Sequence, residues 1–391
     1  MVALVFSNLQ LKSVRTVCRG IIDYERRNGP WHFLFAEGRR EDQNFDLKRL
    51  DADGAIVQNT ALNEVFDILA LGIPVILSES WAEPPVADHP LAGVPFVKMD
   101  SAGVGALAAR YYLERGYRSF AYVGETRDMG WNIERRDGFR GALAAAGFDC
   151  AVYGKLTVRR RCDWAAERPH LIRFLLGLPK PTAILAAMDG RARLVLDACA
   201  AAGLRVPEDI AVLGVDNDPL LCESTHPALS SIRTGGYRRG WKAAEMLDAL
   251  LHGQTIPQQG VVMEPLTVVT RGSTGYDAMR DPVLARALKA IHAEAGRRHF
   301  DVSDAVKAAN CSRRYLEINI RRHLGTTVRE LILREKIERV KSLLETTALT
   351  IGEIVDETGF LHDSHLTTLF KQATGTTMTT WRRTHRDAAD E

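Results

Sequence analysis

A cluster of basic side chains that begins at Arg313 combines residue types suited to contact with nucleic acid. Arg313, Arg314, Arg321 and Arg322 lie close together, and Glu317 is the acidic residue among them. Arginine can bind guanine O6 and N7 with two hydrogen bonds, and it also pairs with phosphate. The formal net charge of the chain is only +2, so a nucleic-acid contact must come from a local patch. Outside a DNA-binding motif, such a cluster is more often a solvated helix face.

Two helix-turn-helix patterns lie in the C-terminal part of the sequence, at 300–325 and 349–375, and the basic cluster is in the first. Each has a short amphipathic helix, a turn, a second helix and a closing glycine. Each also has a turn residue that tolerates positive φ and a polar residue that could cap the second helix: Asn310 and Ser312 in the first, Gly359 and Asp363 in the second. Two recognition helices on one chain could enter two major-groove segments.

Hydrophobic spacing assigns faces to the two predicted recognition helices. Leu316, Ile320 and Leu324 recur every four residues in the first, so Arg313, Arg314 and Glu317 project elsewhere, together with the capping Ser312. Arg313 and Arg314, near the helix start, suit base contacts, and Arg321 and Arg322 suit phosphate contacts. In the second helix we expect Leu366, Leu369 and Phe370 to pack. The exposed candidates there are Ser364, His365, Thr367 and Thr368, with Lys371 as a phosphate contact.

The sequence gives little support to other chemistry. The six cysteines are scattered without metal-ligand spacing, and no metal or disulfide is expected. Gly103, Gly105 and Ala108 follow a predicted strand in a G-x-G-x-x-A spacing, but no acidic residue follows at the distance that a dinucleotide site requires. Small residues there more simply let a helix pack closely against a sheet. We therefore expect no cofactor and no enzyme activity.

The first part of the chain, to about residue 275, alternates short apolar runs with helical patterns. The predicted strands are Val2–Phe6, Trp31–Phe35, Gly54–Val57, Pro74–Leu77, Phe96–Met99, Phe120–Val123, Ala183–Ala187 and Ile210–Gly214. This alternation predicts α/β lobes with parallel sheets and helices on both faces, and ligands bind such sheets at the carboxyl ends of their strands. The N-terminal residues read as a strand rather than a signal peptide, and no apolar stretch is long enough to span a membrane, so we expect a cytoplasmic protein.

A stretch rich in Gly, Asp and Ser before Pro282 predicts a linker at 276–282. We expect an α/β domain over 1–275 and an all-α DNA-binding domain over 283–391. Within the α/β domain, the expected first lobe comprises 1–117 and 234–260. The expected second lobe comprises 118–233 and 261–275.

Three segments of the α/β region resemble the sugar-sensing domain of LacI-type regulators, a two-lobed fold like that of periplasmic binding proteins. They are 94–125, 181–218 with the string VPEDIAVLGVD, and 227–253. From about residue 283 the chain is similar to the AraC-type DNA-binding domain. This order, with AAMDGRAR, GVDND and VTRGST, resembles the XylR-type xylose operon regulators. The resemblance implies a homodimeric regulator that binds operator DNA and a sugar effector such as D-xylose or another monosaccharide, and that contacts RNA polymerase if it is an activator.

The resemblance also implies ligand residues in the sensor. Arg135, Asp189 and Asp216 match LacI-type ligand positions, and Trp131 stands where XylR-type sensors hold a tryptophan. Asn8, at the end of the first strand, is the expected partner from the other lobe. Planar polar groups would bind the hydroxyls and the indole would cover the apolar sugar face. The alternatives are that Asp189 and Asp216 cap the next helices, that Trp131 is core, and that Arg135 is a surface residue.

Some positions depart from the AraC-type pattern. Val328 and Met378 stand where proline is usual after the closing glycines, Val355 stands for an alanine, and Thr368 stands where arginine is frequent. These changes keep the packing pattern but weaken the expected base contacts of the second unit. Two other functions are compatible with parts of the sequence: a transport-type sugar-binding protein and, from the glycine motif, a nucleotide-dependent dehydrogenase.

Overall fold

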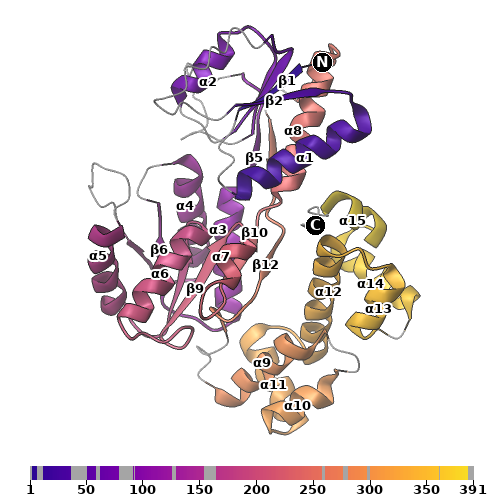
Figure 1. Cartoon of the computed structure of the whole chain (residues 1–391). Helices are drawn as coiled ribbons and strands as arrows, with labels where there is room; N and C mark the ends of the chain where they lie inside the picture. Colours follow the sequence, from indigo (N-terminus) through magenta and orange to yellow (C-terminus); the bar gives the residue numbers. More distant parts are fainter. Residues whose placement is uncertain are drawn as a thin grey trace.

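The computed structural model of the chain has three parts: two α/β lobes and a helical domain (Figure 1). It describes residues 2–6, 12–36, 51–58, 62–78, 91, 93–125, 129–153, 164–257, 260–275, 281–296, 300–360 and 362–385. The helical domain lies beside the second lobe.

The first lobe contains a four-stranded parallel sheet in the order β2-β1-β3-β4. Its strands are β1 (Val2–Phe6), β2 (His32–Ala36), β3 (Gly54–Val57) and β4 (Val75–Leu77). The helices of this lobe are α1 (Lys12–Asn28), α2 (Leu62–Leu69) and α8 (Gly236–Leu251). Helices α1 and α8 pack closely because Gly240 faces the backbone of Val17, where a Cβ atom would lie 1.9 Å from a carbonyl oxygen.

The second lobe contains a six-stranded sheet in the order β12-β10-β9-β8-β6-β7, with β12 antiparallel to β10. Its strands are β6 (Phe120–Val123), β7 (Cys150–Tyr153), β8 (Thr182–Ala186), β9 (Ile210–Val215), β10 (Ser230–Arg233) and β12 (Thr267–Val269). Its helices are α3 (Ser101–Glu114), α4 (Gly130–Ala145), α5 (Trp164–Gly177), α6 (Asp189–Ala201) and α7 (Pro219–Glu223). Strands β8 and β9 are buried along their whole length, which explains their continuous apolar sequences.

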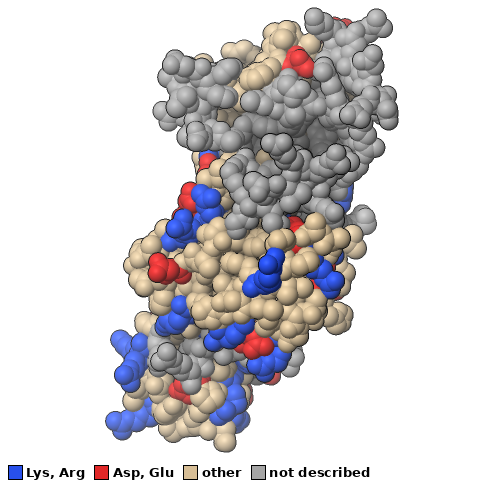
Figure 2. All heavy atoms as spheres, turned by 90° about the vertical axis from the view of Figure 1, so that its left-hand side faces the viewer, with Lys and Arg blue, Asp and Glu red and all other residues tan. Residues whose placement is uncertain are grey.

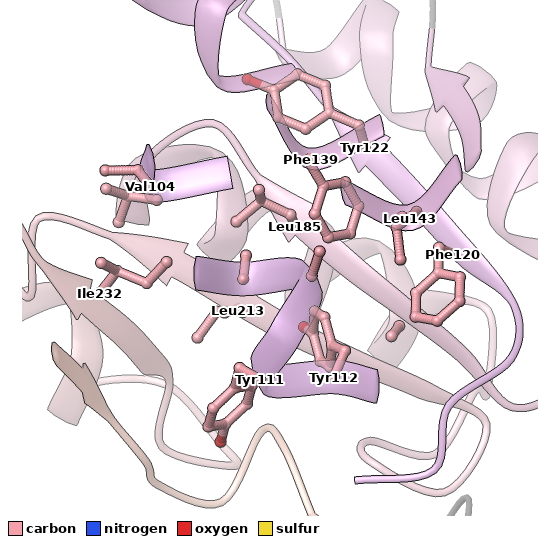
Figure 3. Close-up of a cluster of buried hydrophobic side chains, with 14 of the residues drawn as sticks. Val104, Tyr111, Tyr112, Phe120, Tyr122, Phe139, Leu143, Leu185, Leu213 and Ile232 are labelled. Carbon is pink, nitrogen blue, oxygen red and sulfur yellow. The ribbon is translucent and has the colours of Figure 1, made fainter. Parts of the chain in front are cut away.

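Side chains from α3 and α4 pack on one face of this sheet, as Figure 3 shows for Val104, Tyr112, Phe139 and Leu185. The glycine motif at 103–108 serves this packing. A Cβ atom on Gly105 would lie 2.3 Å from the carbonyl oxygen of Arg135 and 2.4 Å from the backbone nitrogen of Phe139. Close contact between α3 and α4 therefore accounts for Gly105, whereas the sequence suggested close contact with a sheet.

Two expected lobe boundaries differ from the structure. Helix α3, expected in the first lobe because of the boundary at residue 117, packs against the second sheet, so the chain crosses before Ser101. Strand β11 (Val261–Met263) pairs with β5 (Val97–Met99) beside the first sheet, so the last crossing follows Met263 rather than residue 260. Periodicity identified these elements but could not show which sheet each one contacts.

The helical domain consists of α9 (Pro282–Glu294), α10 (Val302–Ala309), α11 (Arg313–Leu324), α12 (Val328–Thr346), α13 (Ile351–Thr358), α14 (Asp363–Thr374) and α15 (Met378–His385). Its two helix-turn-helix units have separate cores, and α12 contributes to both. Val328 and Met378, the departures from proline, are 1% and 2% exposed, so they pack as expected.

The turn chemistry is confirmed with one correction. Asn310 and Gly359 have φ of 51° and 67°, and the Ser312 hydroxyl accepts a hydrogen bond from the Tyr315 backbone N–H at 3.2 Å. Asp363, expected as the second cap, is instead the first helical residue. His362 occupies the cap position of α14 and makes no side-chain capping bond. Among the described residues, no helix is long and apolar enough to cross a membrane.

Candidate sugar site and DNA interface

The carboxyl ends of β8 and β9 bring two carboxylates together in the second lobe. Asp216 directly follows β9, and its backbone has a φ of 101°, followed by 49° at Asn217. Positive φ is uncommon for residues with a side chain, and residues with such strained backbones cluster at functional sites. The Asp216 side chain is half-buried and accepts a 3.3 Å hydrogen bond from the Thr234 hydroxyl. Its carboxylate therefore retains acceptor capacity at the sheet edge.

Asp189 has a different environment, because one of its oxygens contacts the loop that carries Asp216 and the other contacts strand β10. Its side chain is 2% exposed. The Ser231 hydroxyl donates to one oxygen at 2.6 Å, and the Asp218 backbone N–H donates to the other at 2.7 Å. Burial, and then the nearby Asp216 charge, raise the pKa of Asp189 to about 7. The Asp189 carboxylate thus reaches across to the β9 loop. It does not cap its own helix, and it is not exposed to a ligand.

Arg135 and Trp131 lie one turn apart near the start of α4. Arg135 is 5% exposed, which excludes the surface alternative, and it donates through Nη1 to the carbonyl oxygen of Ala187 at the end of β8. Its guanidinium carbon lies 5.0 Å from the ring centroid of Trp131, which is only partly buried. This contact orients the indole and guanidinium as one unit at the same sheet edge. Asn8 lies outside the described residues.

Two polar residues of the first lobe were missed in the sequence reading. Gln58 follows β3 and Ser78 follows β4, and they are 2% and 0% exposed. Neither Oε1 of Gln58 nor Oγ of Ser78 has a hydrogen-bond partner in the described part of the chain. Buried polar atoms are normally paired, so two such atoms at the carboxyl ends of neighbouring strands suggest a ligand site. The available signal was a polar residue directly after a buried apolar run.

The two recognition helices present equivalent faces fifty residues apart. Leu316 and Ile320 in α11 and Leu366 and Phe370 in α14 are all 0% exposed, which confirms the predicted buried seams. Leu324 and Leu369 pack at the edges of the same cores. The predicted DNA-contacting residues are all exposed: Ser312, Arg313, Arg314, Glu317, Arg321 and Arg322 in the first unit, and Ser364, His365, Thr367, Thr368 and Lys371 in the second.

The arginines of α11 differ in their surroundings. Arg313 donates through Nε to Glu317 at 2.7 Å, so part of its hydrogen-bonding capacity is used within the helix. Arg314, in the first turn, is exposed. Figure 2 shows Lys and Arg side chains gathered at the lower end of the molecule, at the level of α10 and α11 in Figure 1. Ile318, one turn after Arg314, is an aliphatic residue that is 54% exposed.

Helix α14 has fewer groups available for base contact. The Thr368 hydroxyl donates to the backbone carbonyl of Ser364 at 2.9 Å, so it is turned toward its own helix. The His365 ring packs edge-on against Phe360, with 6.1 Å between the ring centroids. Lys371 is the remaining basic side chain on this face. The Thr368 hydroxyl and the His365 ring are therefore both engaged in contacts within the second unit.

Two family models match the chain. Residues 109–274 match a periplasmic binding protein-like domain, and residues 305–384 match a helix-turn-helix domain. The xylose operon regulatory protein of Escherichia coli strain K12 is 30% identical over 379 residues, which cover 94% of this chain and 93% of the relative. The corresponding protein of Haemophilus influenzae is 29% identical over 361 residues, which cover 92% of each chain.

Among solved structures, the xylose-binding transcription activator xylR superposes with a TM-score of 0.62 at 27% identity, covering 98% of both chains. The cellobiose complex of the transcriptional regulator CelR gives a TM-score of 0.56 at 26% identity, covering 70% of this chain and 84% of that one. These relatives are transcription regulators and not enzymes. They confirm the expected fold and set aside the transport and dehydrogenase alternatives.

Proposed function

This chain belongs to the family of the xylose operon regulatory proteins, and we propose that it controls an operon for the use of xylose or a related pentose. The observation that carries this proposal is the presence, on one chain, of a two-lobed sugar-sensor fold and two helix-turn-helix units with exposed recognition faces. We assign the sensor to 1–275 and the DNA-binding domain to 283–391, with the linker at 276–282 between them. A regulator of this kind acts in the cytoplasm.

We assign the sugar site to the carboxyl ends of the strands in both lobes. Asp216 accepts hydrogen bonds from sugar hydroxyls, Arg135 donates to a ring or hydroxyl oxygen, and Trp131 covers the apolar face of the sugar. From the first lobe, Gln58 and Ser78 add hydrogen-bonding groups alongside the sequence candidate Asn8. Asp189 acts as a positioning residue that holds the Asp216 loop.

We assign base recognition mainly to α11. Arg314 reads a guanine in the major groove, and Arg321 and Arg322 contact phosphates further along the helix. Ile318 lies on the exposed face between them, where an aliphatic side chain can contact a thymine methyl group. Helix α14 enters a second groove segment mainly through Lys371, Ser364 and Thr367, with a weaker share in base selection.

Sugar and DNA binding are coupled if the sugar binds one lobe arrangement better than another. In the proposed regulator, lobe closure changes how two copies of the chain present their DNA-binding domains. A homodimer would supply four recognition helices to the operator, and an activator would also contact RNA polymerase.

The experiment that tests this proposal is a thermal-shift screen of the full-length chain against pentoses and hexoses. A ligand that binds the folded state raises the unfolding temperature by an amount that grows with its concentration relative to Kd. We expect D-xylose or a close pentose to raise it, and hexoses such as glucose to leave it unchanged at equal concentration. If no monosaccharide stabilises the chain, the sugar-sensor assignment is wrong.

A further inference from the structure

The DNA-binding domain contacts the sensor where the polypeptide passes between the two lobes. Arg233 is the last residue of β10, directly before the chain leaves the second lobe for α8 of the first. Thr267 is the first residue of β12, directly after the chain returns from β11. The backbone N–H of Leu266 donates to the carbonyl oxygen of Arg233 at 2.9 Å, so these two crossings are tied together. Helix α12 contacts both of them (Figure 1).

The contact at Arg233 is buried and involves an ion pair between domains. Arg233 donates through Nη1 to Oε2 of Glu345, and their side chains are 6% and 0% exposed. The second oxygen of Glu345 accepts a 2.9 Å hydrogen bond from the indole N–H of Trp381 in α15. Beside this pair, the Thr267 hydroxyl donates to Glu338 at 2.8 Å. One carboxylate therefore joins the sensor crossing, α12 and the last helix of the DNA-binding domain.

Such an arrangement is sensitive to movement. Taking two charges out of water is costly, and the cost is offset only while the pair keeps good geometry. Arg233 and Glu345 belong to different domains, so a rotation at the crossing changes their distance directly. Helix α15 also contacts α8, so the DNA-binding domain touches both lobes at once. Lobe closure cannot leave all of these contacts unchanged.

The same crossing is connected to the sugar site. Thr234, the residue after Arg233, donates to the Asp216 carboxylate at 3.3 Å. A sugar hydroxyl that binds Asp216 competes for, or reorients, this hydrogen bond. The route from ligand to DNA-binding domain is thus short: Asp216, Thr234, Arg233 and Glu345 are linked by two side-chain contacts and one peptide unit.

We propose that the Arg233–Glu345–Trp381 contact transmits the state of the sensor lobes to the DNA-binding domain of the same chain, by holding that domain in one orientation relative to the lobes. The inference rests on the proposed sugar-responsive function. It adds that coupling passes through the crossing segments to α12 and α15, and does not depend only on how two copies pair.

Thermodynamic reciprocity provides the test. If sugar changes DNA affinity by some factor, DNA must change sugar affinity by the same factor, which is typically about 5- to 150-fold. The probes are D-xylose and the DNA duplex that the full-length chain selects from a random library. Calorimetry gives the Kd for xylose with and without duplex, and anisotropy gives the Kd for duplex with and without xylose.

Each pair of Kd values gives a ratio, namely the Kd without the other ligand divided by the Kd with it. We expect Glu345→Gln to bring both ratios to within about twofold of one while each site still binds its own ligand. Because this variant removes the negative charge of Glu345 from beside the buried Arg233, a double variant, Arg233→Met with Glu345→Leu, keeps the volume and removes both charges. It should lose the coupling in the same way. The matched control is Arg334→Gln, which breaks an exposed interdomain pair with Glu114 at 3.4 Å and should keep the wild-type ratios.

Wild-type ratios in both Glu345→Gln and the double variant would overturn the proposed transmission while leaving the regulator function intact. Loss of coupling in Arg334→Gln to the same extent would also overturn it, because any disturbance of the domain contact would then suffice. A wild-type chain that binds xylose and duplex with ratios of one would refute both the transmission and the proposed sugar response.

Discussion

Replacing Asp216 by alanine should abolish the sugar response while the sensor remains folded. The side chain makes one long internal hydrogen bond, from Thr234 at 3.3 Å, whereas the loop position is fixed by a backbone bond from Asp216 N–H to Ile232 at 2.9 Å. Little native structure therefore depends on the carboxylate. As a carboxylate that accepts hydrogen bonds from sugar hydroxyls, it should contribute about 2–3 kcal/mol to binding. This corresponds to a loss of roughly 30- to 150-fold in sugar affinity.

The contrasting variant is Asp189→Ala. Asp189 is 2% exposed and accepts from Ser231 at 2.6 Å and from the Asp218 N–H at 2.7 Å. Its removal leaves buried donors without partners, and each such donor costs about 1–3 kcal/mol. We therefore expect Asp189→Ala to lower the unfolding temperature markedly, whereas Asp216→Ala should leave it close to wild type.

Calorimetric titration with D-xylose, thermal unfolding and DNA binding without sugar should be measured on both variants. The expected result is lost sugar binding with normal stability and normal DNA binding for Asp216→Ala. Unchanged xylose affinity in that variant would place its carboxylate in a structural role. Normal stability with weak sugar binding in Asp189→Ala would exchange the roles assigned to the two residues.

Further predictions concern the DNA interface, domain independence and pH. Arg314→Ala should weaken DNA binding by roughly 1–3 kcal/mol through the loss of preference at one operator base. Arg321→Ala should weaken binding to all sequences equally and lower the slope of log affinity against log salt concentration by about one. Affinities for an operator point-mutant series at several salt concentrations would show both effects. In Ile318→Ala, the affinity for DNA should not change when thymine in the duplex is replaced by uracil, which lacks the methyl group. If this replacement weakens binding equally in the wild type and the variant, Ile318 does not contact a thymine methyl group. The fragment 281–391 should fold and bind DNA without sugar, since both helical cores consist of its own residues, and an unfolded fragment by circular dichroism would contradict the domain division. The pKa of Asp189 is raised from 3.8 to about 7, so the folded state holds an extra proton in this range. Its contribution to the free energy of unfolding should fall as pH rises from about 4 to 7, by at most about 1.4 kcal/mol per pH unit, and denaturant titrations of Asp189→Asn should lack this slope.

Much of the fold was predictable because its main elements carry strong periodic patterns. The buried strands β8 and β9 appear as continuous apolar runs, and the seam of α11 follows from Leu316 and Ile320 alone. The edge strands were missed for a physical reason. Strand β7 is partly exposed on a sheet edge, and β11 and β12 are only three residues long, so their sequences carry little burial signal.

Side-chain roles were less predictable than positions. Asp189 and Asp216 look alike in sequence, each following a buried strand, yet one is enclosed by donors and the other is half-buried with a strained backbone. That difference arises from Ser231 and Asp218, which approach Asp189 only in the folded sheet. The Arg233–Glu345 pair joins residues 112 positions apart and could not be inferred from local pattern.

The most direct test of the central claim is the affinity of the full-length chain for the DNA duplex that it selects from a random library, measured by anisotropy as D-xylose is titrated. We predict a saturable change in the Kd for DNA as D-xylose is added, which is absent with glucose and absent in Asp216→Ala. A DNA Kd that stays constant across the xylose titration, in a chain that binds this DNA specifically, would contradict it.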